Sequence, residues 1–141
     1  MPFTIKRIYE PAHTGDGRRV LVDRLWPRGV SKSRARLTAW MKQVAPSRAL
    51  RVWFGHRPER FANFARRYRR ELAGNRALGE LRRLGRGTAV TLVYAARDPK
   101  INHAVVLQSV LRSRISAPAR STRRPRSTPR RRRPKPTAAR D

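Results

Sequence analysis

The chain of 141 residues contains no cysteine and only eight acidic residues. Without cysteine it can form no disulfide, no thiolate nucleophile and no zinc site of the cysteine type. No apolar run comes near the ~20 residues that a transmembrane helix needs, and the N-terminal stretch MPFTIKRIYE lacks the apolar core of a signal peptide. These absences predict a soluble, cytoplasmic protein.

The motifs of common nucleotide, metal and hydrolase sites are also missing. The sequence has no GxxxxGK[ST] or GxGxxG phosphate loop, no HExxH zinc motif and no GxSxG nucleophile elbow. Its three histidines, His13, His56 and His103, lack the spacing of metal ligands, and cationic surroundings disfavour a divalent ion. We therefore expect no metal and no organic cofactor.

What the chain has in excess is arginine. Of its 36 basic residues only five are lysine, and the net charge is +28. Residues 113–141 hold 11 basic residues and one acidic residue, so most of the excess lies in residues 1–112. Such a field attracts nucleic acid, phosphorylated metabolites or anionic lipid surfaces. A GC-rich genome would produce the same skew toward arginine without selection for binding, so the charge alone leaves both interpretations open.

Hydrophobic periodicity predicts one small α/β domain over residues 1–112. Strands are expected over 3–9, 19–25 and 88–96, and helices over 31–44, 47–54, 58–72, 78–84 and 98–111. Helices separate the second and third strands, as a parallel crossover requires, whereas the loop after the first strand permits either direction. We predict a three-layer-like domain with a short, mostly parallel sheet flanked by helices.

Two of these helices rest on short patterns. The apolar residues of 37–44 follow the i, i+3, i+4, i+7 spacing of one helix face. Asp98 followed by Pro99 is typical of an N-cap and first helical residue. Asp98 can therefore be either a capping residue or part of a site.

The composition changes at Ser113. Residues 113–141 contain five prolines and a single large aliphatic residue, Ile115. This segment cannot bury enough apolar surface to offset its conformational entropy, so we predict a disordered tail. Its densest basic run is formed by Arg130, Arg131, Arg132 and Arg133. The run suits nonspecific phosphate contact, the alternative being a solvated tail with no partner.

Polar residues gather where the second and third predicted strands end. Ligands bind at the carboxyl edge of open α/β sheets, and arginines facing a helix N-terminus can hold phosphate or carboxylate. The candidate residues for such an anion pocket are Asp23, Arg24, Arg28, Arg97, Asp98, Asn102 and His103.

Three functions remain open at this point. The domain can bind an anion while its tail adds nonspecific nucleic-acid affinity. It can instead be a small enzyme on a phosphorylated or nucleotide-like substrate, with Asp23 and His103 as the acid–base pair. It can also be a scaffold for an acidic protein. His56 follows a predicted helix end, where a cation is favoured in any case, so it is either structural or a ligand contact.

Four strings carry a family resemblance: KRIYEP, DGRRVLVDRLWPRGVSK, LTAWMKQVAPSRALRVWFGHRPERFANFARRYRREL and TLVYAARDPKINHAVVL. Together they resemble the YeaO-like proteins, small bacterial proteins with a domain of unknown function. The resemblance implies an α/β fold and a parallel first strand, which would bring Tyr9 to the same edge. The family pattern includes Asp23, Arg24, Arg28, His56, Asp98, Asn102 and His103. Arg97 stands where the residue varies, and the basic tail lies outside the pattern.

Overall fold

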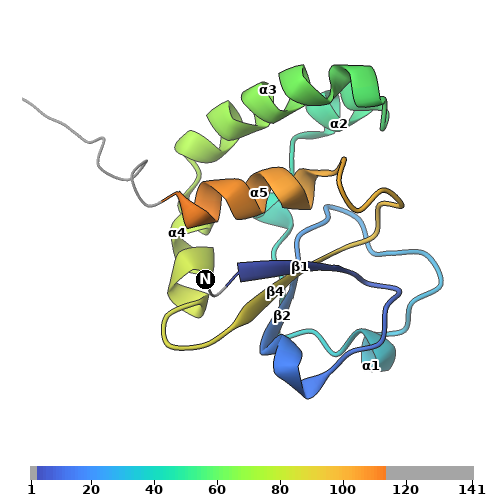
Figure 1. Cartoon of the computed structure of the whole chain (residues 1–141), viewed down its shortest axis with the longest axis vertical. Helices are drawn as coiled ribbons and strands as arrows, with labels where there is room; N and C mark the ends of the chain where they lie inside the picture. Colours follow the sequence, from blue (N-terminus) through green and yellow to red (C-terminus); the bar gives the residue numbers. More distant parts are fainter. Residues whose placement is uncertain (1–2, 114–141) are drawn as a thin grey trace, which may run out of the picture.

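Parallel strands build the sheet in the computed structural model, which describes residues 3–113 (Figure 1). In this part of the chain four strands lie in the order β1 (Phe3–Arg7), β4 (Val90–Tyr94), β2 (Arg18–Leu21) and β3 (Ala39–Trp40). Every neighbouring pair is parallel. The predicted α/β fold with a mostly parallel sheet is confirmed, and so is the parallel first strand.

The helices are α1 (Lys32–Ala35), α2 (Arg48–Phe54), α3 (Phe61–Ala73), α4 (Arg76–Leu84) and α5 (His103–Arg112). Short 3-10 turns occur at Thr14–Asp16, Lys42–Val44 and Pro58–Arg60. The predicted limits of α2 are confirmed, because the Ser47 hydroxyl accepts from the Leu50 N–H and Gly55 ends the helix at φ 53°.

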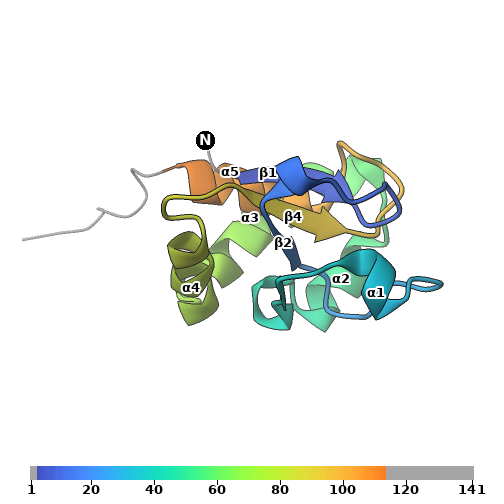
Figure 2. The ribbon, with the colours of Figure 1, turned by 90° about the horizontal axis from the view of Figure 1, so that it is seen from below.

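The strands send alternate side chains to two cores. Val20 and Val22 face the larger core, where α2, α3, α4 and α5 pack. α5 lies directly against β1 and β4, and α3 lies over α5 (Figure 1). Leu21 and Val93 face a smaller core that α1 and the preceding loop cover (Figure 2). Helices therefore flank both faces, as predicted, although the second face has a thinner cover.

The predicted helix over 31–44 is wrong beyond Ala35. Arg36 takes a left-handed conformation at φ 48° and ends α1. The chain then joins the sheet edge as β3, where the Thr38 N–H donates to the Arg19 carbonyl and the Met41 N–H to the Leu21 carbonyl. Trp40 packs on the smaller core and Met41 on the larger one. The helix-like spacing thus comes from an edge strand that supplies both cores.

The start of the last helix also differs from the prediction. α5 begins at His103, and its N-cap is Asn102, whose Oδ1 accepts the Val105 N–H at 3.0 Å. Asp98 instead closes a turn by accepting the N–H groups of Lys100 and Ile101. Asp98 and Pro99 are therefore not the N-cap and first helical residue. The Asp98 carboxylate accepts hydrogen bonds within an Asx turn that precedes the helix.

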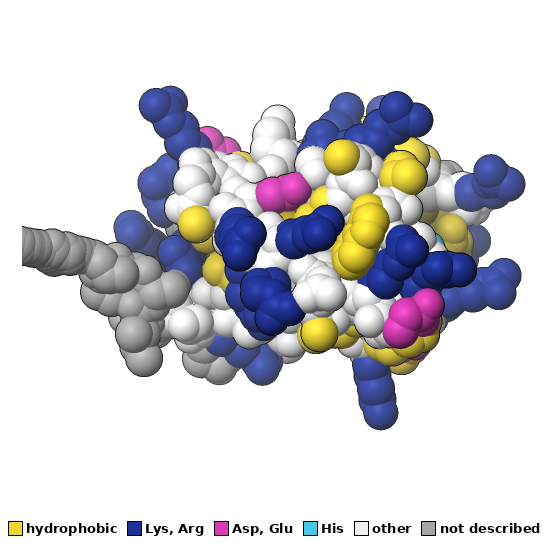
Figure 3. Space-filling model, turned by 90° about the horizontal axis from the view of Figure 1, so that it is seen from above, with side chains coloured by type: hydrophobic (Ala, Val, Ile, Leu, Met, Phe, Trp, Pro, Cys, Tyr) yellow, Lys and Arg dark blue, Asp and Glu magenta, His cyan; other side chains and the backbone are white. Residues whose placement is uncertain are grey.

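The surface carries the charge that the composition implies. Figure 3 looks down onto the α3 side, where Lys and Arg side chains stand over much of the face and acidic side chains are few. None of the helices in the described part of the chain has the length and apolar character needed to cross a bilayer. The disorder predicted for the tail lies outside the described residues, except for Ser113.

Candidate functional site

A pocket of about 340 Å³ lies at the carboxyl edge of the sheet. Its walls come from the loop after β2, the segment entering α2, α2 and α3, the first residues after β4 and the start of α5. Six residues proposed from the sequence line it together: Asp23, Arg24, Arg28, His56, Asn102 and His103. The volume falls in the range of small-molecule sites. The prediction that the ends of β2 and β4 lie at one edge of the sheet is thus confirmed, whereas the roles of these residues stay predictions.

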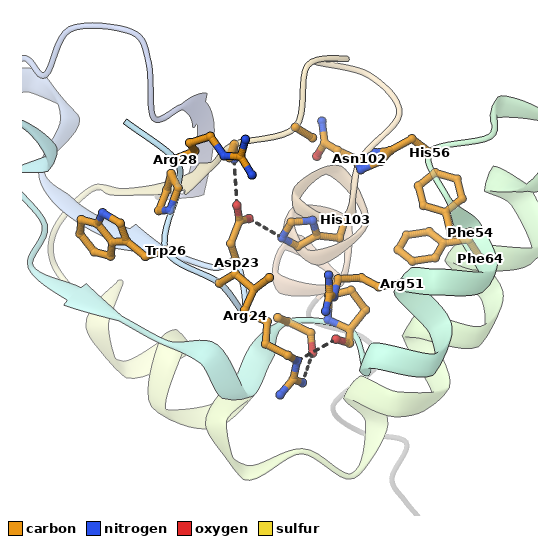
Figure 4. A pocket seen from close by; sticks show the side chains of 16 residues that line it. Asp23, Arg24, Trp26, Arg28, Arg51, Phe54, His56, Phe64, Asn102 and His103 are labelled. Atoms are coloured by element: carbon orange, nitrogen blue, oxygen red, sulfur yellow. Dashed lines mark hydrogen bonds and ion pairs between the residues drawn. The ribbon is translucent and has the colours of Figure 1, made fainter. Parts of the chain in front are cut away.

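One wall of the pocket is apolar. Phe54 from α2 and Phe64 from α3 stack with ring centroids 4.3 Å apart, and Figure 4 shows both beside the cavity. His56 lies next to them, its ring centroid 5.9 Å from that of Phe54. Its backbone is left-handed at φ 59°, a conformation that non-glycine residues adopt at a cost of about 1 kcal/mol or more. The structure therefore holds a strained histidine at the pocket wall.

Asp23 and His103 lie next to each other at the base of the pocket (Figure 4). Asp23 Oδ2 accepts the Ala95 N–H at 3.0 Å, and Oδ1 lies 3.0 Å from His103 Nε2. The same Nε2 lies 3.1 Å from the Val22 carbonyl oxygen. Because both neighbours are acceptors, Nε2 carries the hydrogen, which is aligned with the carbonyl better than with the carboxylate. Nδ1 makes no hydrogen bond with the described residues, and it carries the lone pair whenever the ring is neutral.

Three guanidinium groups reach the pocket, and they differ in their partners. Arg24 donates to the carbonyls of Ala45 and Pro46, at 3.4 and 3.3 Å. Arg28 makes no side-chain hydrogen bond or ion pair with the described residues. Arg51 extends from α2 toward His103 (Figure 4), and its buried Nε has no hydrogen-bond partner among the described residues. Arg28 and Arg51 therefore hold unused donors at the pocket.

The buried Tyr68 contacts two segments beside the pocket. Burial raises the pKa of Tyr68, and the charges of Glu71 and Asp23 raise it further. The hydroxyl therefore stays protonated and donates to the Val44 carbonyl, which joins α3 to the turn before α2. The Tyr68 ring also lies edge-on to His103, with centroids 6.4 Å apart.

The other proposed site residues lie elsewhere or are engaged in the fold. Asn102 is 1% exposed, and its amide group both caps α5 and donates to the Asp98 carbonyl at 2.7 Å. Arg97 and Asp98 line an adjoining cavity, which shares His56, Ala95 and Ala96 with the main pocket. Tyr9 lies outside the main pocket and donates from its hydroxyl to the Arg28 carbonyl at 3.0 Å. Tyr9 thus fixes the loop that carries Arg28.

Sequence reasoning missed Arg51 and the Phe54–Phe64 wall. In a chain so rich in arginine, nothing distinguishes Arg51 from its neighbours until α2 is placed against the sheet. Within residues 3–113, no three His, Asp or Glu side chains come together as metal ligands would. Arg130, Arg131, Arg132 and Arg133, the proposed nucleic-acid contacts, lie beyond the described residues.

Comparisons with known proteins identify relatives along most of the chain. Residues 2–130 match the family model described as "Inactive DUF488-N3 subclade". "Uncharacterized protein Rv3073c" of Mycobacterium tuberculosis is 48% identical over 110 residues, which are 78% of this chain and 93% of that protein. "Uncharacterized protein YeaO" of Escherichia coli K12 is 41% identical over 114 residues, 80% of this chain and 99% of that protein. No solved structure matches the chain. Because these matches extend over nearly the whole fold, the chain belongs to the YeaO-like bacterial proteins, in the group described as the inactive DUF488-N3 subclade.

Proposed function

We propose that the domain binds a small organic anion, bearing a phosphate or carboxylate group, in the pocket at the carboxyl edge of the sheet. The observation that carries this proposal is the guanidinium group of Arg51, a residue that lines the pocket and whose buried Nε has no partner among the described residues. An anion that accepts from this guanidinium group would gain a charge-assisted hydrogen bond, which is roughly twice as strong as a neutral one.

The rest of the pocket suits such a ligand. Arg28 supplies a second free guanidinium group, and planar guanidinium forks match the oxygens of phosphate and carboxylate. The nearby carboxylate of Asp23 is only partly satisfied, since Oδ2 accepts the Ala95 N–H while the buried Oδ1 has no hydrogen-bond partner among the described residues; the guanidinium groups at the pocket outnumber this one negative charge. The apolar wall of Phe54 and Phe64 would take the ligand's uncharged part.

Binding without turnover is supported by the family description, which contains the word "inactive". The enzyme alternative keeps one specific observation in its favour, the Asp23–His103 contact with an unused Nδ1. A general base needs such a lone pair beside the substrate. The variant His103→Gln separates the two functions. If the natural chain changes no ligand chemically and the variant still binds, the domain is a binding protein. If the natural chain turns a ligand over and the variant does not, the domain is an enzyme.

Replacing Arg51 by glutamine should weaken binding of small anions by about tenfold, because the ligand loses a charge-assisted hydrogen bond. The measurement is calorimetric titration of the full chain with inorganic phosphate and with nucleoside monophosphates. Arg51→Lys keeps the charge without the fork and should recover only part of the affinity.

Arg86→Gln is the matched control, since it removes one exposed arginine far from the pocket. Equal losses in Arg51→Gln and Arg86→Gln would show that overall charge, and not the pocket, attracts the anion.

We further propose that the tail adds nonspecific nucleic-acid affinity, supported by its 11 basic residues against one acidic residue. Replacing Arg130, Arg131, Arg132 and Arg133 together by glutamine should lower duplex DNA affinity by about tenfold and flatten its salt dependence. Fluorescence anisotropy with a labelled duplex at several salt concentrations measures both quantities. An unchanged slope would leave the tail without a role in phosphate contact.

A further inference from the structure

The outer surface of α2 and α3 has a charge pattern that the pocket does not explain. Residues 47–73 contain eight arginines but only two acidic residues, Glu59 and Glu71. We refer to the arginines of this segment other than Arg51 as the basic face: Arg48, Arg57, Arg60, Arg66, Arg67, Arg69 and Arg70. All are exposed except Arg60, which is half-buried. The α3 side of the molecule accordingly shows many Lys and Arg side chains (Figure 3).

Trp53 organises two of these arginines. The Cζ atom of Arg67 lies 4.4 Å from the centre of the Trp53 ring, and that of Arg60 lies 5.0 Å from it. Arg60 also donates from Nη1 to the Trp53 carbonyl. Arg67 has no hydrogen bond or ion pair with the described residues, so the ring orders its guanidinium group without using any of its donors.

This arrangement favours phosphate binding over simple charge attraction. A free arginine loses side-chain entropy when it binds, whereas a guanidinium group already ordered against an aromatic ring loses less. Its N–H edge stays open for the two oxygens of a phosphate. Arg67 on α3 and Arg60, the residue before α3, therefore form a pre-ordered pair of phosphate donors. Arg67 offers all its N–H groups, and Arg60 offers those that the Trp53 carbonyl does not use.

The shape of the basic face fits a linear polyanion. α3 has 13 residues and is roughly 20 Å long, which corresponds to about six phosphates along one strand of a duplex. A lipid surface fits less well, because Val52 is the only residue of α2 and α3 among the large hydrophobic side chains exposed in the described chain.

We propose that the basic face docks the phosphodiester backbone of nucleic acid, with Arg60 and Arg67 ordered on Trp53 as its central contacts. The site is separate from the anion pocket and does not depend on it. It lies in the folded domain, so it also differs from any contribution of the tail.

The test compares full-chain variants, so that the tail is common to all. Arg60→Gln combined with Arg67→Gln should lower affinity for a short labelled DNA duplex about tenfold. It should also reduce the slope of log affinity against log salt by about 1.8, for two lost phosphate contacts. Arg83→Gln combined with Arg86→Gln removes the same charge from exposed positions at the end of α4 and should change affinity less than about twofold. Arg60→Lys combined with Arg67→Lys keeps the charge and should still bind less tightly than the natural chain.

Three outcomes would overturn the proposal. Equal losses in the two glutamine pairs would mean that general charge attracts the duplex. Full affinity in the lysine pair would mean that ordering by Trp53 contributes nothing. Binding to phosphatidylserine vesicles that depends on Arg60 and Arg67, with no such dependence for the duplex, would assign the face to a membrane. A circular dichroism melt of each variant confirms that the fold is retained.

Discussion

Replacing Asp16 by alanine should lower the free energy of unfolding by about 3 kcal/mol, a large fraction of the stability of a small domain. The Asp16 carboxylate accepts from Arg19 Nη1 at 2.7 Å, from Lys6 Nζ at 3.1 Å and from the His13 N–H at 3.1 Å. Arg19 is 3% exposed, and its Nη2 already lacks a partner among the described residues. Without Asp16 a buried guanidinium group and a half-buried ammonium group lose their counter-charge.

Urea unfolding followed by circular dichroism measures this loss. Glu59→Ala is the matched control, because it removes one carboxylate from an equally cationic chain. Its side chain is 68% exposed and lies 3.9 Å from Arg57, so it should cost less than about 0.5 kcal/mol. Similar losses in the two variants would show that net charge, and not the Asp16 contacts, sets the stability.

The same carboxylate predicts how stability depends on pH. Burial alone would raise the pKa of Asp16, but hydrogen bonds from His13, Lys6 and Arg19 outweigh it and lower the pKa below 3.8. A group whose pKa is lower in the folded state stabilises the protein above its unfolded pKa. This contribution should therefore be complete above about pH 5 and decline as the pH falls through 4 and below. Asp16→Ala should show a weaker decline over that range.

The sequence was informative where one physical rule acted alone. The apolar runs around Val20 and Leu92 predicted buried strands, and the distance between them in the chain predicted a parallel pair, which the sheet confirms. Parallel strands end at one edge, so Asp23 and His103 could be placed in one pocket without knowledge of any contact.

The misses come from contacts between distant segments. The residues of 37–44 have helical spacing, yet hydrogen bonds to Arg19 and Leu21 draw them into the sheet. The sequence around Asp16 indicates only a turn, because its partners Lys6 and Arg19 become neighbours only when β1 and β2 take their places in the sheet. Arg51 likewise becomes a candidate only through its buried Nε, which lacks a partner among the described residues.

The polar strand ends serve the fold and the pocket together. Asp23 connects the end of β2 to the Ala95 N–H after β4, and its main-chain carbonyl accepts from Trp40 Nε1 at 2.8 Å. Arg24 fixes the segment before α2 through its contacts with two main-chain carbonyls. These contacts position the pocket walls, whereas Arg28 and Arg51 keep donors that the fold does not use. Pocket variants should therefore separate into those that alter stability and those that alter binding alone.

Replacing Gly17 by alanine should destabilise the domain by about 3 kcal/mol or more, by a different mechanism. Gly17 has φ 67° and ψ −136°, outside the left-handed helical region, a conformation that costs an L-residue about 1–3 kcal/mol. In addition, a Cβ atom at this position would lie 2.3 Å from the Ala89 carbonyl oxygen. That oxygen accepts the Arg18 N–H at 3.0 Å where β2 begins beside β4, so the clash would displace main chain and not a movable side chain.

Alanine variants at two other glycines separate the cost of the positive φ at Gly17 from the cost of the clash with Ala89. Gly87 has φ 72°, and no atom lies within 4 Å of the position that a Cβ would occupy, so Gly87→Ala should show only the conformational cost of about 1–2 kcal/mol. Gly79 lies within α4, has no positive φ and has open space around the same position. Gly79→Ala should therefore be neutral or stabilise the domain by up to about 1 kcal/mol. Thermal and urea unfolding of the three variants should rank them in this order. If Gly17→Ala is as stable as Gly87→Ala, β2 and β4 can separate at this point without cost. That result would contradict the argument from the close contact between Gly17 and Ala89.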